Sequence, residues 1–137
     1  MLREEQRLMQ FMSPEHVTTM NALLEESADV RAAACELDRD YVLAYRLSDA
    51  LDGRMEHWTM TLGPDGVRFA LEPAAAPDLE VQAAYAEMIR SVQRARAGEP
   101  PETELTPVGD LAVLERIAPV YAVAQQVATV AVEFPEV

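Results

Sequence analysis

The chain has 137 residues, of which 24 are acidic and 11 basic, so its formal net charge at pH 7 is −13. This length is typical of one domain, and such a chain can build a hydrophobic core without disulfides or metals. Hydrophobic residues make up 50% and charged residues 26% of the sequence, which argues against disorder. The acidic balance excludes nucleic acids and anionic lipid surfaces as partners, because both attract lysine and arginine.

The sequence predicts a cytoplasmic protein that does not insert into a membrane. The first residues, MLREEQRL, are charged and lack the apolar core of a signal peptide. The most apolar stretch, Ile117–Val132, is interrupted by Pro119 and two glutamines and is too short to span a bilayer comfortably. Every basic residue is arginine, which together with abundant alanine indicates a bacterial genome rich in G and C. The single cysteine, Cys35, is predicted to be a small buried residue of a helix.

Helical signals dominate the first third of the chain. Residues 1–12 lack a clear helix start and are treated as an N-terminal extension. Ser13 followed by Pro14 is typical of a helix N-terminus, because serine caps the free N–H groups and proline needs no hydrogen-bond partner there. A second helical pattern begins at Asp29, so we expect a bend near Ser27.

Alternation of apolar and polar residues then predicts strands. The four predicted strands are Tyr41–Ser48, His57–Leu62, Val67–Glu72 and Asp78–Gln82. Two turn signals separate the first three of them, Asp52-Gly53 and Gly63-Pro64-Asp65-Gly66, because glycine supplies positive φ and proline presets φ. Short strands joined by tight turns predict an antiparallel meander with one apolar face.

Helical periodicity returns over Ala83–Ala97 and Asp110–Gln126. Pro119 either interrupts the second of these helices or begins a new helical segment. The pattern at 127–134 fits both a helix and a strand, so that both stay open, and 128–137 is taken as a C-terminal tail.

Five short motifs, in this order and spacing, resemble the SCP2-like (sterol carrier protein 2) family. They are Trp58-Thr-Met-Thr-Leu62, Pro64-Asp-Gly66-Val67, Pro77-Asp-Leu-Glu-Val81, Arg96-Ala-Gly98-Glu99 and Val108-Gly-Asp110. The resemblance covers roughly Asn21 to Gln126. It implies one α+β domain over residues 1–137, an antiparallel β-meander sheet covered by helices, with an apolar tunnel between the layers for acyl chains, sterols or similar ligands. It does not imply catalysis.

The chain departs from that family in one segment. Between the glycine that ends the third helix and the Gly-Asp pair, the family usually has a further helix and a strand, whereas only Glu99–Val108 fills the gap here. Pro107 disfavours a fifth strand in this segment, because proline cannot donate a ladder hydrogen bond. Whether the fifth strand and the mouth of the tunnel exist therefore stays open.

The candidate ligand-binding residues are apolar side chains, since a carrier needs apolar volume with few polar contacts. They come from the inward strand faces and from the helices above them. The set is Trp58, Met60, Phe69, Leu71, Met88, Val92, Leu114, Ile117 and Tyr121. Simple core packing is the competing interpretation for each of them, and whether a ligand is carried or converted stays open.

Two other classes of function are weighed against a carrier. A small cavity enzyme of cyclase or isomerase type, in bacterial specialised metabolism, would use Tyr45 or His57 as proton donor. The two histidines, His16 and His57, are predicted to be solvated, and no sequence motif for a metal site, a nucleotide or a catalytic nucleophile occurs. No metal or other cofactor is expected. A homodimeric interaction module, with the apolar tail as its dimer seam, is the third hypothesis.

Overall fold

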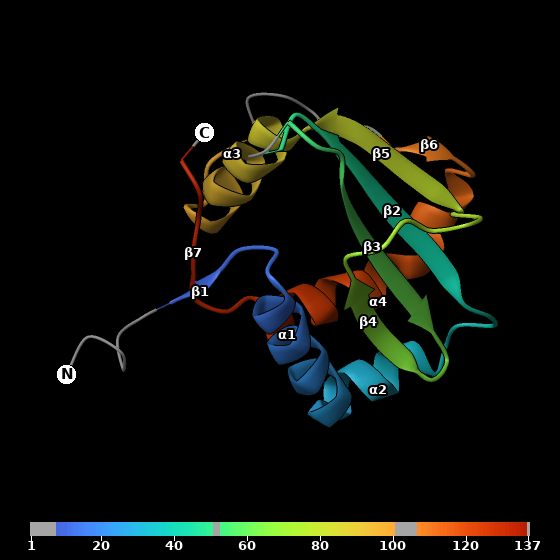
Figure 1. Cartoon of the computed structure of the whole chain (residues 1–137). Coiled ribbons are helices and arrows are strands. Elements are labelled where there is room, and N and C mark those ends of the chain that lie inside the picture. Colours follow the sequence, from blue (N-terminus) through green and yellow to red (C-terminus); the bar gives the residue numbers. More distant parts are fainter. Residues whose placement is uncertain (1–7, 51–52, 101–106, 137) are drawn as a thin grey trace.

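The computed structural model describes residues 8–50, 53–100 and 107–136 (Figure 1). Over these residues a five-stranded mixed sheet, a two-stranded ribbon and helices form an α+β domain, as the sequence predicts. The elements are β1 (Met9–Gln10), α1 (Pro14–Glu26), α2 (Ala28–Ala34), β2 (Tyr41–Ser48), β3 (Glu56–Gly63), β4 (Gly66–Ala70), β5 (Leu79–Ala84), α3 (Tyr85–Arg96), β6 (Val108–Gly109), α4 (Ala112–Ala128) and β7 (Val132–Glu133).

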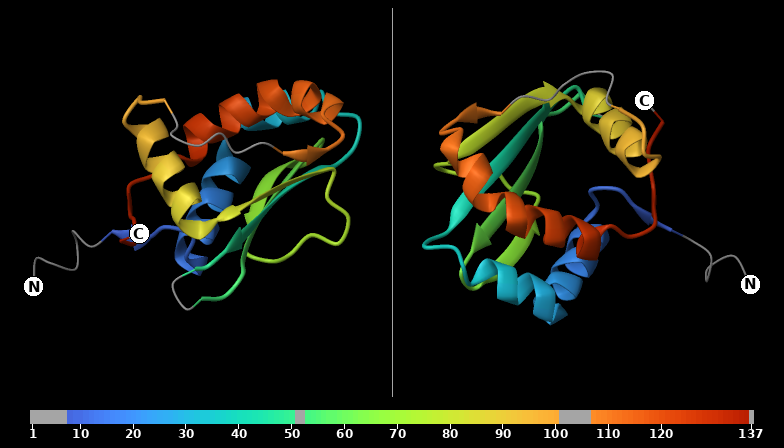
Figure 2. Two further views of the ribbon diagram at one scale, coloured as in Figure 1. Left: turned by 90° about the horizontal axis from the view of Figure 1, so that it is seen from above. Right: turned by 180° about the vertical axis from the view of Figure 1, so that it is seen from behind.

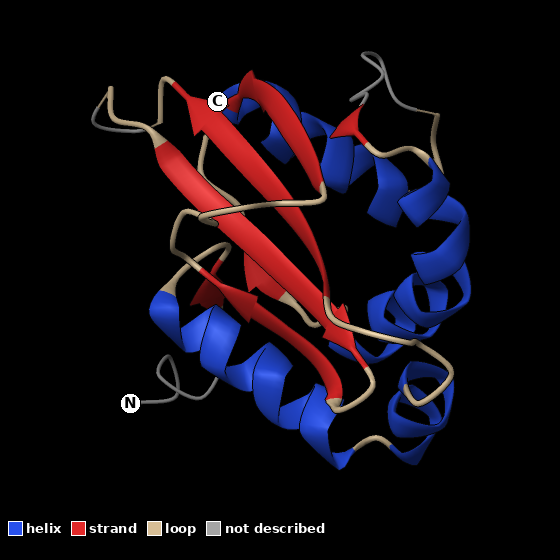
Figure 3. Ribbon diagram, turned by 90° about the vertical axis from the view of Figure 1, so that its right-hand side faces the viewer, coloured by secondary structure: helices blue, strands red, loops and turns tan. Residues whose placement is uncertain are grey.

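The central sheet has the strand order β4-β3-β2-β5-β6. Strands β2, β3 and β4 form the predicted antiparallel meander, with Tyr45 opposite Trp58 and Met60 opposite Phe69. The prediction of a fully antiparallel meander was wrong for β5, which pairs with β2 in parallel. The connection over residues 71–78 does not turn back tightly but crosses the outer face of the sheet (Figure 3). There the Thr59 hydroxyl donates a hydrogen bond of 2.6 Å to the Glu72 carbonyl.

A fifth strand, β6, completes the sheet and pairs antiparallel with β5. Pro107 lies just before this strand, so it removes no hydrogen bond from the ladder. The backbone of Gly109 approaches that of Asp78 closely, and the Asp110 N–H donates to the Asp78 carbonyl at 3.2 Å. The short 99–108 segment therefore still allows the fifth strand.

Replacing Gly109 by alanine is expected to destabilise this edge of the sheet strongly. Gly109 has a φ of +135°, and a Cβ atom there would lie 2.2 Å from the Asp78 carbonyl oxygen. Gly66 is the matched control, because its φ is +133° but no atom lies within 4 Å of its added Cβ. We expect Gly66→Ala to cost about 1–2 kcal/mol from backbone strain alone, and Gly109→Ala about 1–3 kcal/mol more from the clash. Urea unfolding of both variants measures the difference, and equal losses would contradict it.

The helices lie on one side of the sheet (Figure 2). The predicted bend between the first two helices falls at Ser27, which ends α1 and caps α2 by accepting a hydrogen bond from the Val30 N–H. Helix α4 continues through Pro119 without a break. None of the helices in the described ranges is long and apolar enough to cross a membrane.

Cys35 is exposed, so the prediction that it is buried was wrong. Helix α2 buries Val30 and Ala34, and Cys35 follows Ala34 as the C-cap residue. Cys35 follows Val30 by five residues. In a helix this spacing turns the Cys35 side chain about 140° around the axis from that of Val30, so the two point in different directions. The helical pattern that includes Cys35 therefore does not bring it into the core.

The core lies between the inner sheet face and the helices. As expected from the alternation, Tyr41, Leu43, Trp58, Met60 and Phe69 are buried on that face.

The two ends of the described chain meet beside the core (Figure 1). Strands β1 and β7, which we call the terminal ribbon, pair in parallel through Met9 with Val132 and Gln10 with Glu133. Phe11, directly after β1, is buried and donates its N–H to the Glu133 carbonyl at 2.9 Å. Residues 127–134, whose pattern fits both a helix and a strand, contain one after the other. Helix α4 ends at Ala128, and the short strand β7 follows.

Candidate functional site

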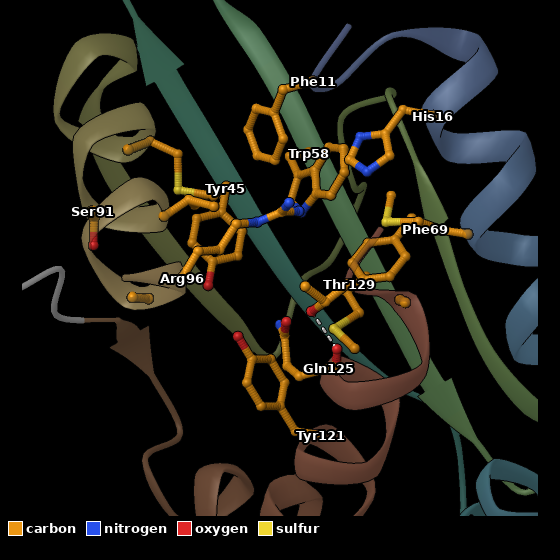
Figure 4. A pocket seen from close by; sticks show the side chains of 16 residues that line it. Phe11, His16, Tyr45, Trp58, Phe69, Ser91, Arg96, Tyr121, Gln125 and Thr129 are labelled. Carbon is orange, nitrogen blue, oxygen red and sulfur yellow. Dashed lines mark hydrogen bonds between the residues drawn. The ribbon is translucent and has the colours of Figure 1, made fainter. Parts of the chain in front are cut away.

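A cavity of about 570 Å³ lies between the inner face of the sheet and the helices. Its walls come from the sheet, from α3, from the second half of α4, and from α1 with the chain just before it (Figure 4). The lining residues are Phe11, His16, Met20, Tyr45, Trp58, Met60, Phe69, Met88, Ser91, Val92, Ala95, Arg96, Tyr121, Gln125, Ala128 and Thr129.

Most of the candidate residues meet in this cavity. Those that line it are Trp58, Met60, Phe69, Met88, Val92 and Tyr121. Leu71, Leu114 and Ile117 do not line it. Leu71 lies beyond the end of β4, Leu114 is 38% exposed on α4, and Ile117 is packed in the solid core. Only the second half of α4 borders the cavity. The helical pattern therefore identified residues of α4 that face inward, but not which of them border the cavity and which pack in the core.

Aromatic rings form one wall of the cavity around Trp58. The Trp58 ring lies 5.8 Å from Phe11, 5.0 Å from Phe69 and 6.0 Å from His16, measured between ring centroids. Phe11 in turn lies 4.9 Å from Phe134, which directly follows β7 and packs against the Phe11 ring without lining the cavity itself. Flat rings of this kind offer a large apolar contact surface.

His16 is buried, with 1% of its surface exposed, so the prediction that it is solvated was wrong. Its ring packs against Phe11 and Trp58 rather than facing solvent from the first turn of α1. The Nδ1 atom accepts a hydrogen bond of 3.1 Å from the Met12 N–H. An imidazole nitrogen that accepts carries no proton, so the neutral ring holds its proton on Nε2. Burial, and secondly the positive charge of Arg96, lower the pKa of His16 to about 4.

A sequence signal for this burial exists. His16, Met20 and Leu24 are spaced by four residues along α1, and all three are buried. Residues at this spacing share one helix face, so the histidine continues the apolar stripe. His57, by contrast, lies with Ala44 and Thr59 beside a shallow groove on the outer sheet face. It is therefore separated from the cavity by the sheet, and the prediction that it could reach a bound ligand there was wrong.

Arg96 brings a positive charge to the cavity from the last turn of α3. Its guanidinium donates a hydrogen bond of 2.7 Å to the Val130 carbonyl and lies 5.2 Å from the centre of the Phe134 ring. Among the residues that the structure describes, no carboxylate forms an ion pair with Arg96. Burial lowers the pKa of Arg96, as expected for a charge that is partly removed from water.

Two tyrosines that line the cavity, Tyr45 on β2 and Tyr121 on α4, lie beside each other with their hydroxyls pointing toward one another (Figure 4). Burial raises the pKa of the Tyr45 hydroxyl above its usual range, and its interaction with Tyr121 raises this pKa further. The sequence indicates Tyr45 only as a proton donor, and its patterns do not identify Phe11, His16 and Arg96 as wall residues. Within residues 8–50, 53–100 and 107–136 no cluster of three or more side chains that could hold a metal ion occurs.

The sheet, the helices on one side of it and the cavity between them define an α+β domain that encloses apolar space. Two solved structures share the fold of this domain. A crystal structure of sterol carrier protein 2 is 18% identical with a TM-score of 0.57, and the match covers 86% of this chain and 96% of that chain. The solution structure of TT1886 from Thermus thermophilus is 19% identical with a TM-score of 0.52, covering 90% and 94%.

The chain thus has the fold of sterol carrier protein 2, as the ordered sequence motifs indicate. No protein-family model and no curated protein matches its sequence.

Proposed function

We propose that the chain binds an apolar small molecule in this cavity and carries it without converting it. The observation that supports this most directly is the cavity itself, whose volume of about 570 Å³ is within the range of roughly 300–1,000 Å³ that small-molecule sites occupy. Its wall is mostly apolar and aromatic, with a few polar groups at defined places. The likeness in fold to sterol carrier protein 2 agrees with a lipid-like ligand.

The acid–base properties of the wall favour a carrier over an acid–base catalyst. General acid–base catalysis works best when the pKa of the catalytic group is near the operating pH. The pKa of His16 is lowered to about 4, and that of Tyr45 is raised above its usual range. Neither group exchanges a proton readily near neutral pH, so these residues suit hydrogen bonding better than proton transfer.

Fluorescence of Trp58 tests the proposal, because it is the only tryptophan and lines the cavity. Titration with 1-decanol and with decanoate is expected to change its emission saturably, with dissociation constants in the micromolar range for at least one probe. Val92→Phe places extra volume in the cavity and is expected to weaken binding at least tenfold. Because the space already exists, its stability cost stays below the roughly 1–3 kcal/mol of overpacking a solid core.

Ala118→Phe is the matched control, since Ala118 is exposed on α4 and does not line the cavity. It is expected to leave binding unchanged. If neither probe changes the emission of Trp58 saturably, the carrier function is wrong, and the interaction-module hypothesis takes its place.

A further inference from the structure

The exposed side chains of the cavity wall mark its mouth. Among the lining residues, the exposed ones are Ala95 and Arg96, in the last turn of α3, and Gln125 and Thr129, at the end of α4. The remaining lining residues are buried or half-buried. A molecule that reaches the cavity from water therefore meets the protein between the ends of these two helices (Figure 4).

The side chain of Arg96 bridges this mouth. Its guanidinium donates a hydrogen bond of 2.7 Å to the carbonyl of Val130, in the segment that follows α4, and lies 5.2 Å from the centre of the Phe134 ring. No other hydrogen bond within the described parts of the chain ties α3 to this segment. The two sides of the mouth are thus joined there by one charge-assisted hydrogen bond.

The last turn of α3 is held less firmly than its first. The buried residues of this helix all lie between positions 85 and 89, whereas Ala95 and Arg96 near its end are exposed. The segment across the mouth is fixed on its far side, because β7 pairs with β1 and the Glu133 carbonyl accepts a hydrogen bond from the Phe11 N–H. Segments with few buried contacts open at the lowest free energy, so the end of α3 is the part that moves when the Arg96 hydrogen bond breaks.

We propose that Arg96 is a latch on the cavity: the ligand enters and leaves between the ends of α3 and α4, and each passage requires the hydrogen bond from Arg96 to Val130 to break. This inference rests on the proposed binding function and concerns the rate of ligand exchange. A latch that is closed in both the free and the loaded protein slows entry and exit by the same factor. It therefore sets the rates and leaves the affinity unchanged.

Replacing Arg96 by methionine tests the latch, because methionine keeps an unbranched side chain at the mouth but cannot donate to Val130. Stopped-flow measurement of Trp58 emission gives the association and dissociation rate constants of 1-decanol, which carries no charge for Arg96 to attract. We expect both constants to rise about tenfold to a hundredfold, the factor for one hydrogen bond from a charged group, while the dissociation constant changes less than about twofold. Arg90→Met is the matched control, since Arg90 is exposed on the same helix and does not line the cavity. Its rates should equal those of the wild-type protein.

Fixing the mouth shut is the reverse experiment. Cys35 is first replaced by serine, because it is an exposed thiol. Ala95→Cys and Thr129→Cys then place one thiol on each side of the mouth, and a short bismaleimide joins them. Cross-linking is expected to slow decanol exchange at least about tenfold relative to the same protein before cross-linking, as for a lid that cannot open. A disulfide between Met9→Cys and Val132→Cys, which are paired in the terminal ribbon, is expected to leave the rates unchanged.

The outcomes distinguish this inference from the function on which it rests. Faster exchange at unchanged affinity in Arg96→Met, together with slower exchange after cross-linking, supports the latch. Wild-type exchange rates in Arg96→Met, exchange unaffected by the cross-link, or exchange slowed by the ribbon disulfide overturns it and leaves the carrier function intact. Binding of neither 1-decanol nor decanoate overturns both.

The cross-linked protein also decides the question in two special cases, because it keeps Arg96. One is an Arg96→Met variant that thermal unfolding shows to be unfolded. The other is a wild-type protein that binds decanoate but not 1-decanol, for which decanoate exchange is measured before and after cross-linking.

Discussion

Replacing Asn21 by leucine is expected to lower the free energy of unfolding by about 2–4 kcal/mol, a large share of the stability of a small domain. Asn21 lies on α1 and makes two hydrogen bonds to one residue of the edge strand β4. Its Nδ2 donates to the Phe69 carbonyl at 3.0 Å, and its Oδ1 accepts from the Phe69 N–H at 2.7 Å. The side chain thus replaces a neighbouring strand at this point, and leucine would leave both backbone groups unpaired under a helix.

Two further variants control this experiment. Asn21→Asp has the same shape and keeps the acceptor for the Phe69 N–H, but it opposes the Phe69 carbonyl with a second acceptor, so we expect a loss close to that of leucine. Ala22→Leu places leucine at an exposed position of the same helix and is expected to change stability by no more than about 0.5 kcal/mol. Urea unfolding measures all three. An Asn21→Leu variant as stable as Ala22→Leu would show that these hydrogen bonds do not hold β4 to α1.

Acidification from about pH 6.5 to pH 4 is expected to destabilise the domain through His16. The pKa of His16 is about 4 in the folded chain and 6.5 in an unfolded one. Between these values the unfolded state binds a proton that the folded state does not, so the free energy of unfolding falls as pH falls. The loss reaches on the order of 3 kcal/mol near pH 4, from 1.36 kcal/mol for each pKa unit. Arg96, from α3, is the charged group that acts on His16.

Unfolding of wild-type protein and of His16→Gln in urea, at several pH values between 4 and 7, isolates this contribution. The variant lacks the titrating group, so its stability should depend less on pH across this window. Asp38 and Asp78, whose pKa values are lowered from 3.8, lose their stabilising effect only at still lower pH. Parallel pH profiles for the two proteins would contradict the assignment to His16.

The fold could be predicted from the sequence wherever local chemistry decides it. Ser13 and Ser27 begin the first two helices because their hydroxyls cap free N–H groups, and the period-two alternation located the strands. The pairing of β5 was not predictable in this way, because alternation shows that a segment is a strand but not which strand it joins. The parallel pairing with β2 depends on the path of residues 71–78 across the sheet.

The candidate site was predictable only in part, for a related reason. Trp58, Met60 and Phe69 were found because they share the inward face of adjacent strands. Phe11 and Arg96 were missed because the terminal ribbon and the end of α3 bring them to the cavity from distant parts of the chain. A periodic pattern identifies inward side chains, but the boundary between packed core and open space depends on how whole elements are placed.

The terminal ribbon has a consequence for the order in which the molecule is assembled. The hairpins of β2, β3 and β4 join residues near in sequence, whereas the contact of Phe11 with Phe134 joins opposite ends of the described chain. Closing so long a loop costs more chain entropy than closing a hairpin, and contacts of this kind slow folding. The sheet can therefore form early, while the aromatic wall is completed among the last steps, when the C-terminal strand joins β1.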